Sequence, residues 1–72
     1  MIELIKADKH CTLSIQNDLF GKVYVHHLVT KKYKYMKGVW SKTYIFDEIK
    51  LAKELLFDLE SRYRSRGYTY AD

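Results

Sequence analysis

A period of two in the placement of apolar residues constrains the fold more than any other feature of this sequence. Apolar and polar residues alternate from Cys11 to Gln16, and from Lys22 onward Val23, Val25, His27 and Val29 fall on one face of a second run. Val39 to Phe46 is a third run, rich in residues that favour strands. Such alternation is typical of strands with one buried face. Turn-forming residues separate these runs at Asn17 to Gly21 and at Met36 to Gly38. We therefore expect three antiparallel strands in a meander.

The flanking segments complete an α+β fold in a single domain over residues 1–72. Ile2 to Lys6 is expected to form an edge strand, followed by a polar connection from Ala7 to His10. Together these give an antiparallel sheet of three to four strands. It packs against one C-terminal amphipathic helix, expected from Glu48 to Arg66.

Asp47 is the expected N-cap of that helix, with Glu48 in its first turn, and Gly67 the residue that ends it. The side of the helix expected to face the sheet contains Ile49, Leu51, Ala52, Leu55, Leu56, Leu59 and Tyr63.

The second long run is longer than a typical strand. This run starts near Lys22. If every second residue is followed from Val23, the face with the valines also includes Lys31, Tyr33 and Tyr35. We therefore expect a bulge or bend near Thr30 to Lys32. His26 and His27 should point to opposite faces.

Lys22 to Phe46 is basic and aromatic, with six lysines and no Asp or Glu, although the chain holds nine acids in total. Lysines meet phosphates and flat rings stack on bases, so the stretch predicts DNA or RNA binding. The alternative is a solvated strand surface whose lysines prevent edge-to-edge association. The expected nucleic-acid-binding residues are Lys31, Lys32, Tyr33, Lys34, Lys37, Trp40, Lys42, Arg64 and Arg66.

Phe57 is the residue that most suggests a protein partner, because it falls among charged residues on the polar side of the helix. The second functional hypothesis is a protein-interaction, regulatory or inhibitor module. It would use either the basic face or the outer helix face, and a homodimer is one form of it.

Enzymatic chemistry has no recognisable constellation here, so we expect no enzyme, cofactor or small-molecule substrate. His10-Cys11 and His26-His27 lack the spacing of a zinc site, so we expect no metal. Cys11 reads as a core residue. No apolar run is long enough to cross a membrane, and the charged N-terminus does not read as a signal peptide. We expect a cytoplasmic protein without a membrane partner.

Several segments resemble the WGR domain family, particularly its short bacterial single-domain members. The matching features are LIKAD at Leu4 to Asp8, LFG at Leu19 to Gly21, the amphipathic helix, and RSRGY at Arg64 to Tyr68. The tripeptide that names the family is absent, and Val29-Thr30-Lys31 stands at its place. The resemblance implies a small curved antiparallel sheet against one helix, acting in DNA contact or as an interaction module.

Overall fold

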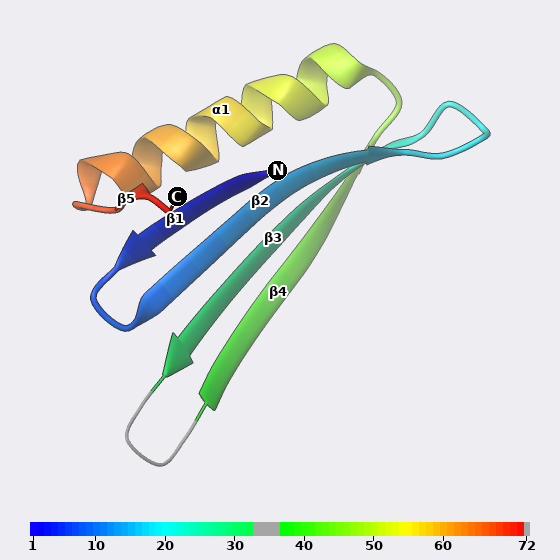
Figure 1. Cartoon of the computed structure of the whole chain (residues 1–72). Coiled ribbons are helices and arrows are strands. Elements are labelled where there is room, and N and C mark those ends of the chain that lie inside the picture. The colour runs from blue at the N-terminus through cyan, green and yellow to red at the C-terminus, as the bar shows by residue number, and fades with distance from the viewer. Residues whose placement is uncertain (33–36, 72) are drawn as a thin grey trace.

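The computed structural model describes the backbone of residues 1–32 and 37–71, and the side chains of 1–31 and 38–71 (Figure 1). The sheet holds five antiparallel strands in the order β4-β3-β2-β1-β5, and one helix packs against it. The elements are β1 (Ile2–Lys6), β2 (Lys9–Asn17), β3 (Val23–Lys32), β4 (Lys37–Phe46), α1 (Ile49–Ser65) and β5 (Thr69–Tyr70). The α+β class and the meander of β1 to β4 are confirmed, and β5 is a strand beyond the three to four expected.

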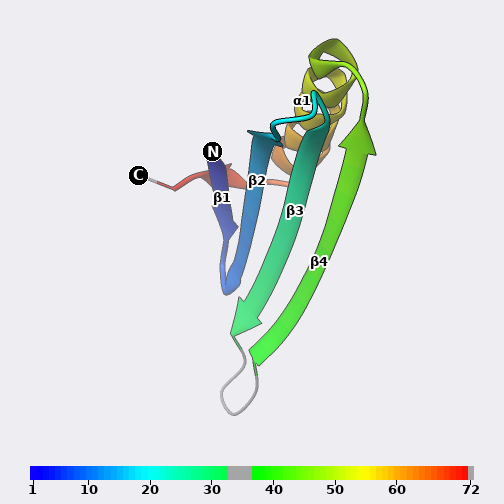
Figure 2. The ribbon, with the colours of Figure 1, turned by 90° about the vertical axis from the view of Figure 1, so that its right-hand side faces the viewer.

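One face of the sheet carries the core because the period of two puts the same class of residue on neighbouring strands. Leu4, Cys11 and Leu13 are fully buried, as is Val25 on β3. Helix α1 covers them with a narrow stripe. The stripe consists of Ala52, Leu55, Leu56, Leu59 and Tyr63. β2, β3 and β4 run side by side over almost the whole length of β3, and among the described residues only the Lys32–Lys37 pair lies beyond β2 (Figures 1 and 2).

The helix stripe is narrower than the predicted one. Ile49 and Leu51 are 43% and 46% exposed, so their assignment to the buried side was wrong. Neighbouring residues of a helix point about 100° apart, so Leu51 lies beside the stripe that contains Ala52 and not on it. Phe57 is 71% exposed, as expected for its place among charged residues.

The helix start also differs from the prediction. Glu48 occupies the N-cap position without a side-chain cap hydrogen bond, and the first turn holds no acid. Asp47 lies one residue before the cap, and its carboxylate pairs instead with the Lys22 ammonium. The helix end is confirmed: Gly67 has φ +94°, and the Tyr68 amide donates to the Tyr63 carbonyl at 3.1 Å.

Strands β2 and β4 are longer than predicted. β2 begins at Lys9 and β4 at Lys37, so Lys9, His10 and Lys37-Gly38 belong to strands and not to connections. The expected bulge is also absent from the described part of β3, whose pairing runs without a skipped residue from Val23↔Phe46 to Lys32↔Lys37. β3 is held on both sides by long partners, and its curvature is spread along its length (Figure 2).

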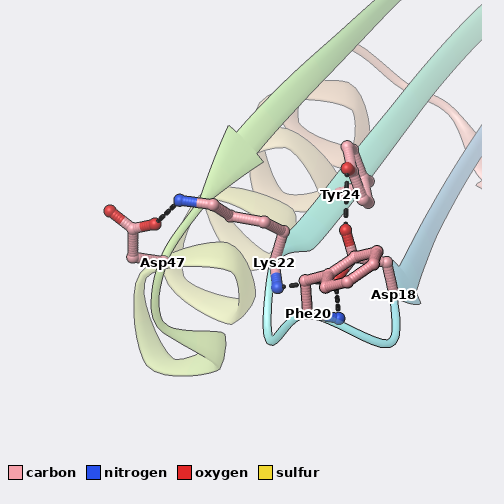
Figure 3. A network of polar contacts seen from close by, with 5 residues as sticks. All are labelled: Asp18, Phe20, Lys22, Tyr24 and Asp47. Atoms are coloured by element: carbon pink, nitrogen blue, oxygen red, sulfur yellow. Dashed lines mark hydrogen bonds and ion pairs between the residues drawn. The ribbon is translucent and has the colours of Figure 1, made fainter.

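The connection from β2 to β3 is organised by Asp18 (Figure 3). Its carboxylate accepts the backbone amides of Phe20 and Lys22 at 2.8 and 2.9 Å, and the Tyr24 hydroxyl at 2.9 Å. Gly21 supplies the positive φ of +82° that the turn needs. The last strand then joins the two chain ends: β5 pairs with β1, and the Ala71 amide donates to the Glu3 carbonyl at 2.9 Å.

Candidate nucleic-acid interface

The register of the β3–β4 hairpin places several predicted site residues on the helix-side face of the sheet. Lys31 lies opposite Gly38, and Lys42 lies opposite the buried His27. Trp40 falls between Gly38 and Lys42 on the same face of β4 and is 50% exposed. Tyr33 and Lys34 lie outside the described residues, as do the side chains of Lys32 and Lys37.

The same face holds two lysines that the sequence analysis did not assign to the site. Lys6 pairs with Lys9, and Lys9 pairs with Lys31, so three lysines lie directly opposite one another on β1, β2 and β3. We call Lys6, Lys9 and Lys31 the lysine row. Neighbouring strands are about 4.8 Å apart, so the row spans about 10 Å at the backbone.

Like charges directly opposite on a sheet destabilise it, so the row is unfavourable for folding alone. The ion pairs among the described side chains are Lys22 with Asp47 and Arg62 with Asp58, and neither includes a lysine of the row. Lys9 and Lys31 are half-buried, which brings their aliphatic stems against the sheet. The row is therefore a concentrated cationic feature for which the described side chains provide no ion-pair partner.

The row lies one step beyond the core, where the helix ends. The next residues on the same face are Leu4, Cys11, Val29 and Trp40, in register with one another. The Lys6 ammonium donates to the carbonyl of Arg66, the residue that caps α1. Arg66 therefore borders the row, and its guanidinium lies 5.8 Å from the centre of the Tyr63 ring.

Arg64 does not join this group. Its guanidinium lies 4.8 Å from the ring centre of Tyr70 on β5, whose hydroxyl donates to Glu60. β5 and β4 form opposite edges of the sheet, so Arg64 is separated from Trp40 and Lys42. The structure therefore does not bring Arg64 together with Trp40 and Lys42, and its role in nucleic-acid binding stays a prediction.

Trp40 is held by a buried aromatic cluster. Its ring meets the His27 ring edge to face at 4.7 Å between centres, and His27 meets Tyr63 in the same way at 5.4 Å. The His27 Nε2 and Tyr63 hydroxyl oxygen are hydrogen-bonded at 2.6 Å. His26 lies on the other face of the sheet, where its ring nitrogens contact Thr43 and Gln16 at 3.2 Å. The expected divergence of the two histidines is confirmed.

Burial sets the protonation of this cluster. It lowers the pKa of His27, whose Nδ1 is buried with no partner among the described residues. It raises the pKa of Tyr63 to about 12 and also raises that of the Cys11 thiol. The cluster is therefore neutral near pH 7 and holds Trp40 without adding charge.

Lys42 and the apolar surface beside Trp40 complete the interface. The Lys42 ammonium lies 4.8 Å from the centre of the Tyr44 ring. A shallow hollow beside Trp40 is lined by Val29, Lys31, Gly38, Val39 and Trp40, and we call this the Trp40 hollow. Lys31 therefore borders the hollow beside the half-exposed Trp40 ring, and Lys42 lies two residues further along β4 with its ammonium near Tyr44.

A signal for Lys6 and Lys9 was present in the sequence. Lys6 follows Ile2 and Leu4 in steps of two, and Lys9 precedes Cys11 and Leu13 in the same steps. Extending the count beyond the apolar residues would have put both lysines on the core face. The position of Lys6 and Lys9 opposite Lys31 depends on strand register, which alternation along one strand does not determine.

Comparison with protein-family models, with curated proteins and with solved structures finds no match. Across residues 1–32 and 37–71, no group of three or more His, Cys, Asp or Glu is arranged to hold a metal ion. No helix in the described chain is long and apolar enough to cross a membrane. The geometry of the interface is therefore the basis for a functional proposal.

Proposed function

We propose that this chain is a non-enzymatic, WGR-like module that binds DNA or RNA mainly through backbone phosphates. The observation that carries the proposal is the lysine row, three opposed lysines on neighbouring strands. Such an arrangement costs folding energy, and a polyanion that bridges the ammonium groups offsets this cost. Lys42 and Arg66 extend the cationic surface on either side.

Salt dependence tests this proposal. If five cations, Lys6, Lys9, Lys31, Lys42 and Arg66, neutralise phosphates, the logarithm of the duplex-DNA affinity falls with the logarithm of salt concentration with a slope of about −4 to −5. The measurement is a fluorescence-anisotropy titration at several salt concentrations. A slope shallower than about −1, or no binding at low salt, contradicts the proposal.

A pair of matched double variants locates the surface. Changing Lys9 and Lys31 to Gln removes two charges from the row and should make the slope shallower by about 2. The control changes Lys50 and Lys53 to Gln, which removes the same charge from exposed positions on α1. Equal effects from both pairs would mean that net charge, and not the row, determines binding.

A second candidate function, docking to a protein, is favoured by the outer face of α1. Phe57 is exposed and lines a shallow, mainly apolar hollow with Ile49, Lys50, Lys53 and Glu54. Exposed aromatic rings beside apolar hollows are common anchors of protein interfaces. This candidate includes association of two copies, and also a regulator that presents its basic face to an acidic protein.

Two measurements separate the candidates. Pull-down from lysate with and without nuclease should lose all bound material after nuclease if the module binds nucleic acid alone. Phe57→Ser should leave the mass measured by light scattering unchanged if Phe57 is only an exposed side chain. A fall from dimer to monomer would instead assign the helix face to self-association.

A further inference from the structure

Contacts with phosphates involve the lysine row and leave the Trp40 hollow empty. Gly38 contributes no side chain opposite Lys31, and a Cβ built there would come within 3.9 Å of the Lys31 Cβ. Gly38 thus lines the hollow beside Trp40 and places no side chain in it. The hollow lies directly beside the lysine row, on the same face of the sheet.

The orientation of Trp40 is set before any ligand binds. The edge-to-face contact with His27, itself hydrogen-bonded to Tyr63, restrains the indole ring. Half of the Trp40 surface nevertheless remains exposed. A restrained and half-exposed ring loses little conformational entropy when a second flat ring packs against it.

We propose that the ligand of this surface is single-stranded nucleic acid, with one unstacked base lying in the Trp40 hollow against the indole. This inference rests on the proposed function. The phosphates of the strand lie along the lysine row. The base lies beside Val29 and Trp40, the next residue pair toward the core. A duplex keeps its bases stacked on one another, so it offers this ring no free base face.

Charge alone predicts tighter binding of duplex than of single-stranded nucleic acid. Duplex DNA carries the denser phosphate charge, so a surface that recognises phosphates only binds duplex more tightly. Equal or tighter binding of a single strand therefore requires a contact with bases. Trp40 supplies the exposed π-face for this contact.

The experiment uses Trp40 as its own probe, since it is the only tryptophan of the chain. The full chain is titrated with oligothymidylate, with an abasic strand of the same length, and with a duplex of the same length, at one salt concentration. Oligothymidylate should quench the Trp40 fluorescence, whereas the abasic strand and the duplex should bind without quenching it.

Substitution of the ring gives the second measurement, by anisotropy of labelled strands. Trp40→Leu should weaken oligothymidylate binding by roughly 5- to 150-fold, the range for loss of one base–aromatic stack, and leave duplex binding within about twofold. Trp40→Phe should restore part of the loss because it returns a π-face. Phe57→Leu is the matched control on the helix and should change neither affinity, and circular dichroism checks that each variant folds.

Several outcomes overturn the inference. If the three ligands bind with equal affinity and leave the fluorescence unchanged, while the double change of Lys9 and Lys31 to Gln still weakens binding, the base contact is wrong and the phosphate surface stands. If none of the ligands binds at low salt, both proposals fail. If Trp40→Leu leaves oligonucleotide affinity unchanged but removes a nuclease-resistant protein from a pull-down, Trp40 contacts a protein instead.

Discussion

His27 is the residue at which the core and the candidate interface meet. It is only 5% exposed, and its ring touches Trp40 on the sheet and Tyr63 on the helix. A second proton on the imidazole would place a charged N–H at the buried Nδ1, which lacks a partner among the described residues. Protonation of this one side chain should therefore affect both stability and the position of Trp40.

The pH dependence of unfolding should show this effect. Burial holds the pKa of His27 below its usual value, which is about 6.5 in an unfolded chain. Below that pH the unfolded state binds more protons than the folded state, so the free energy of unfolding falls as the pH drops from about 7 to 5. Chemical denaturation at several pH values measures it.

Two variants test the assignment to His27. His27→Gln should remove most of the loss between pH 7 and 5, whereas His26→Gln on the other face should retain it. An unchanged pH profile in His27→Gln would show that other groups account for the loss.

At the scale of elements, α1 holds the fold together through a narrow stripe. Leu59 is 7% exposed and packs on the cluster that includes Leu4 and Leu13, whereas Leu51 is 46% exposed at the edge of the stripe. The residues of the stripe are spaced by three and four, as expected for one face of a helix. Leu59 and Leu51 should therefore respond very differently to the same truncation.

Leu59→Ala should lower the free energy of unfolding by about 2–5 kcal/mol, because it removes buried methyl groups and leaves a cavity. Leu51→Ala, the matched control, should cost less than about 1 kcal/mol. Urea denaturation followed by circular dichroism gives both values. Equal costs would mean that the helix is rotated relative to the sheet described here.

Locally determined features of the fold could be predicted from the sequence, and features set by distant pairing could not. The phases of β2, β3 and β4 follow from alternation and turn chemistry, and Gly67 follows from the need for a positive φ. Asp47 lies one residue before the cap and pairs instead with Lys22, 25 residues away, a contact that local sequence does not indicate. Lys9 was missed as a strand residue because pairing with β1 and β3, not its own propensity, extends β2.

The candidate site was partly predictable for the same reason. Alternation put Lys31 on the valine face, and put Trp40 and Lys42 on one face of the next strand. Only the register shows that these faces coincide and that Lys6 and Lys9 lie beside Lys31. Arg64 and Arg66 were grouped by sequence, but helix geometry separates them.

For the molecule as a whole, the lysine row is expected to lower folding stability while it provides the proposed binding surface. Lys9 lies between Lys6 and Lys31 and so experiences repulsion from both sides. Functional surfaces that cost stability are common where a ligand supplies the missing charge. The two effects can be measured on one variant.

Lys9→Gln should raise the free energy of unfolding by about 0.2–1 kcal/mol, because it relieves two like-charge contacts across the sheet. The gain should shrink as salt screens the repulsion, and nucleic-acid affinity should fall in the same variant. Urea denaturation at low and high salt measures the first effect, and anisotropy the second. Lys50→Gln should show neither, and a loss of stability in Lys9→Gln would contradict the repulsion.

The pairing of β5 with β1 joins segments from opposite ends of the given sequence, and the candidate interface is likewise assembled from distant segments. Lys6, Lys9, Lys31 and Arg66 come from the first strand, the second, the third and the end of the helix, so no short segment contains the complete surface. A ligand that needs all four binds the folded chain and not the unfolded one. Folding and binding are then thermodynamically linked: at a free ligand concentration 100 times Kd, the ligand adds about 2.7 kcal/mol to the free energy of unfolding.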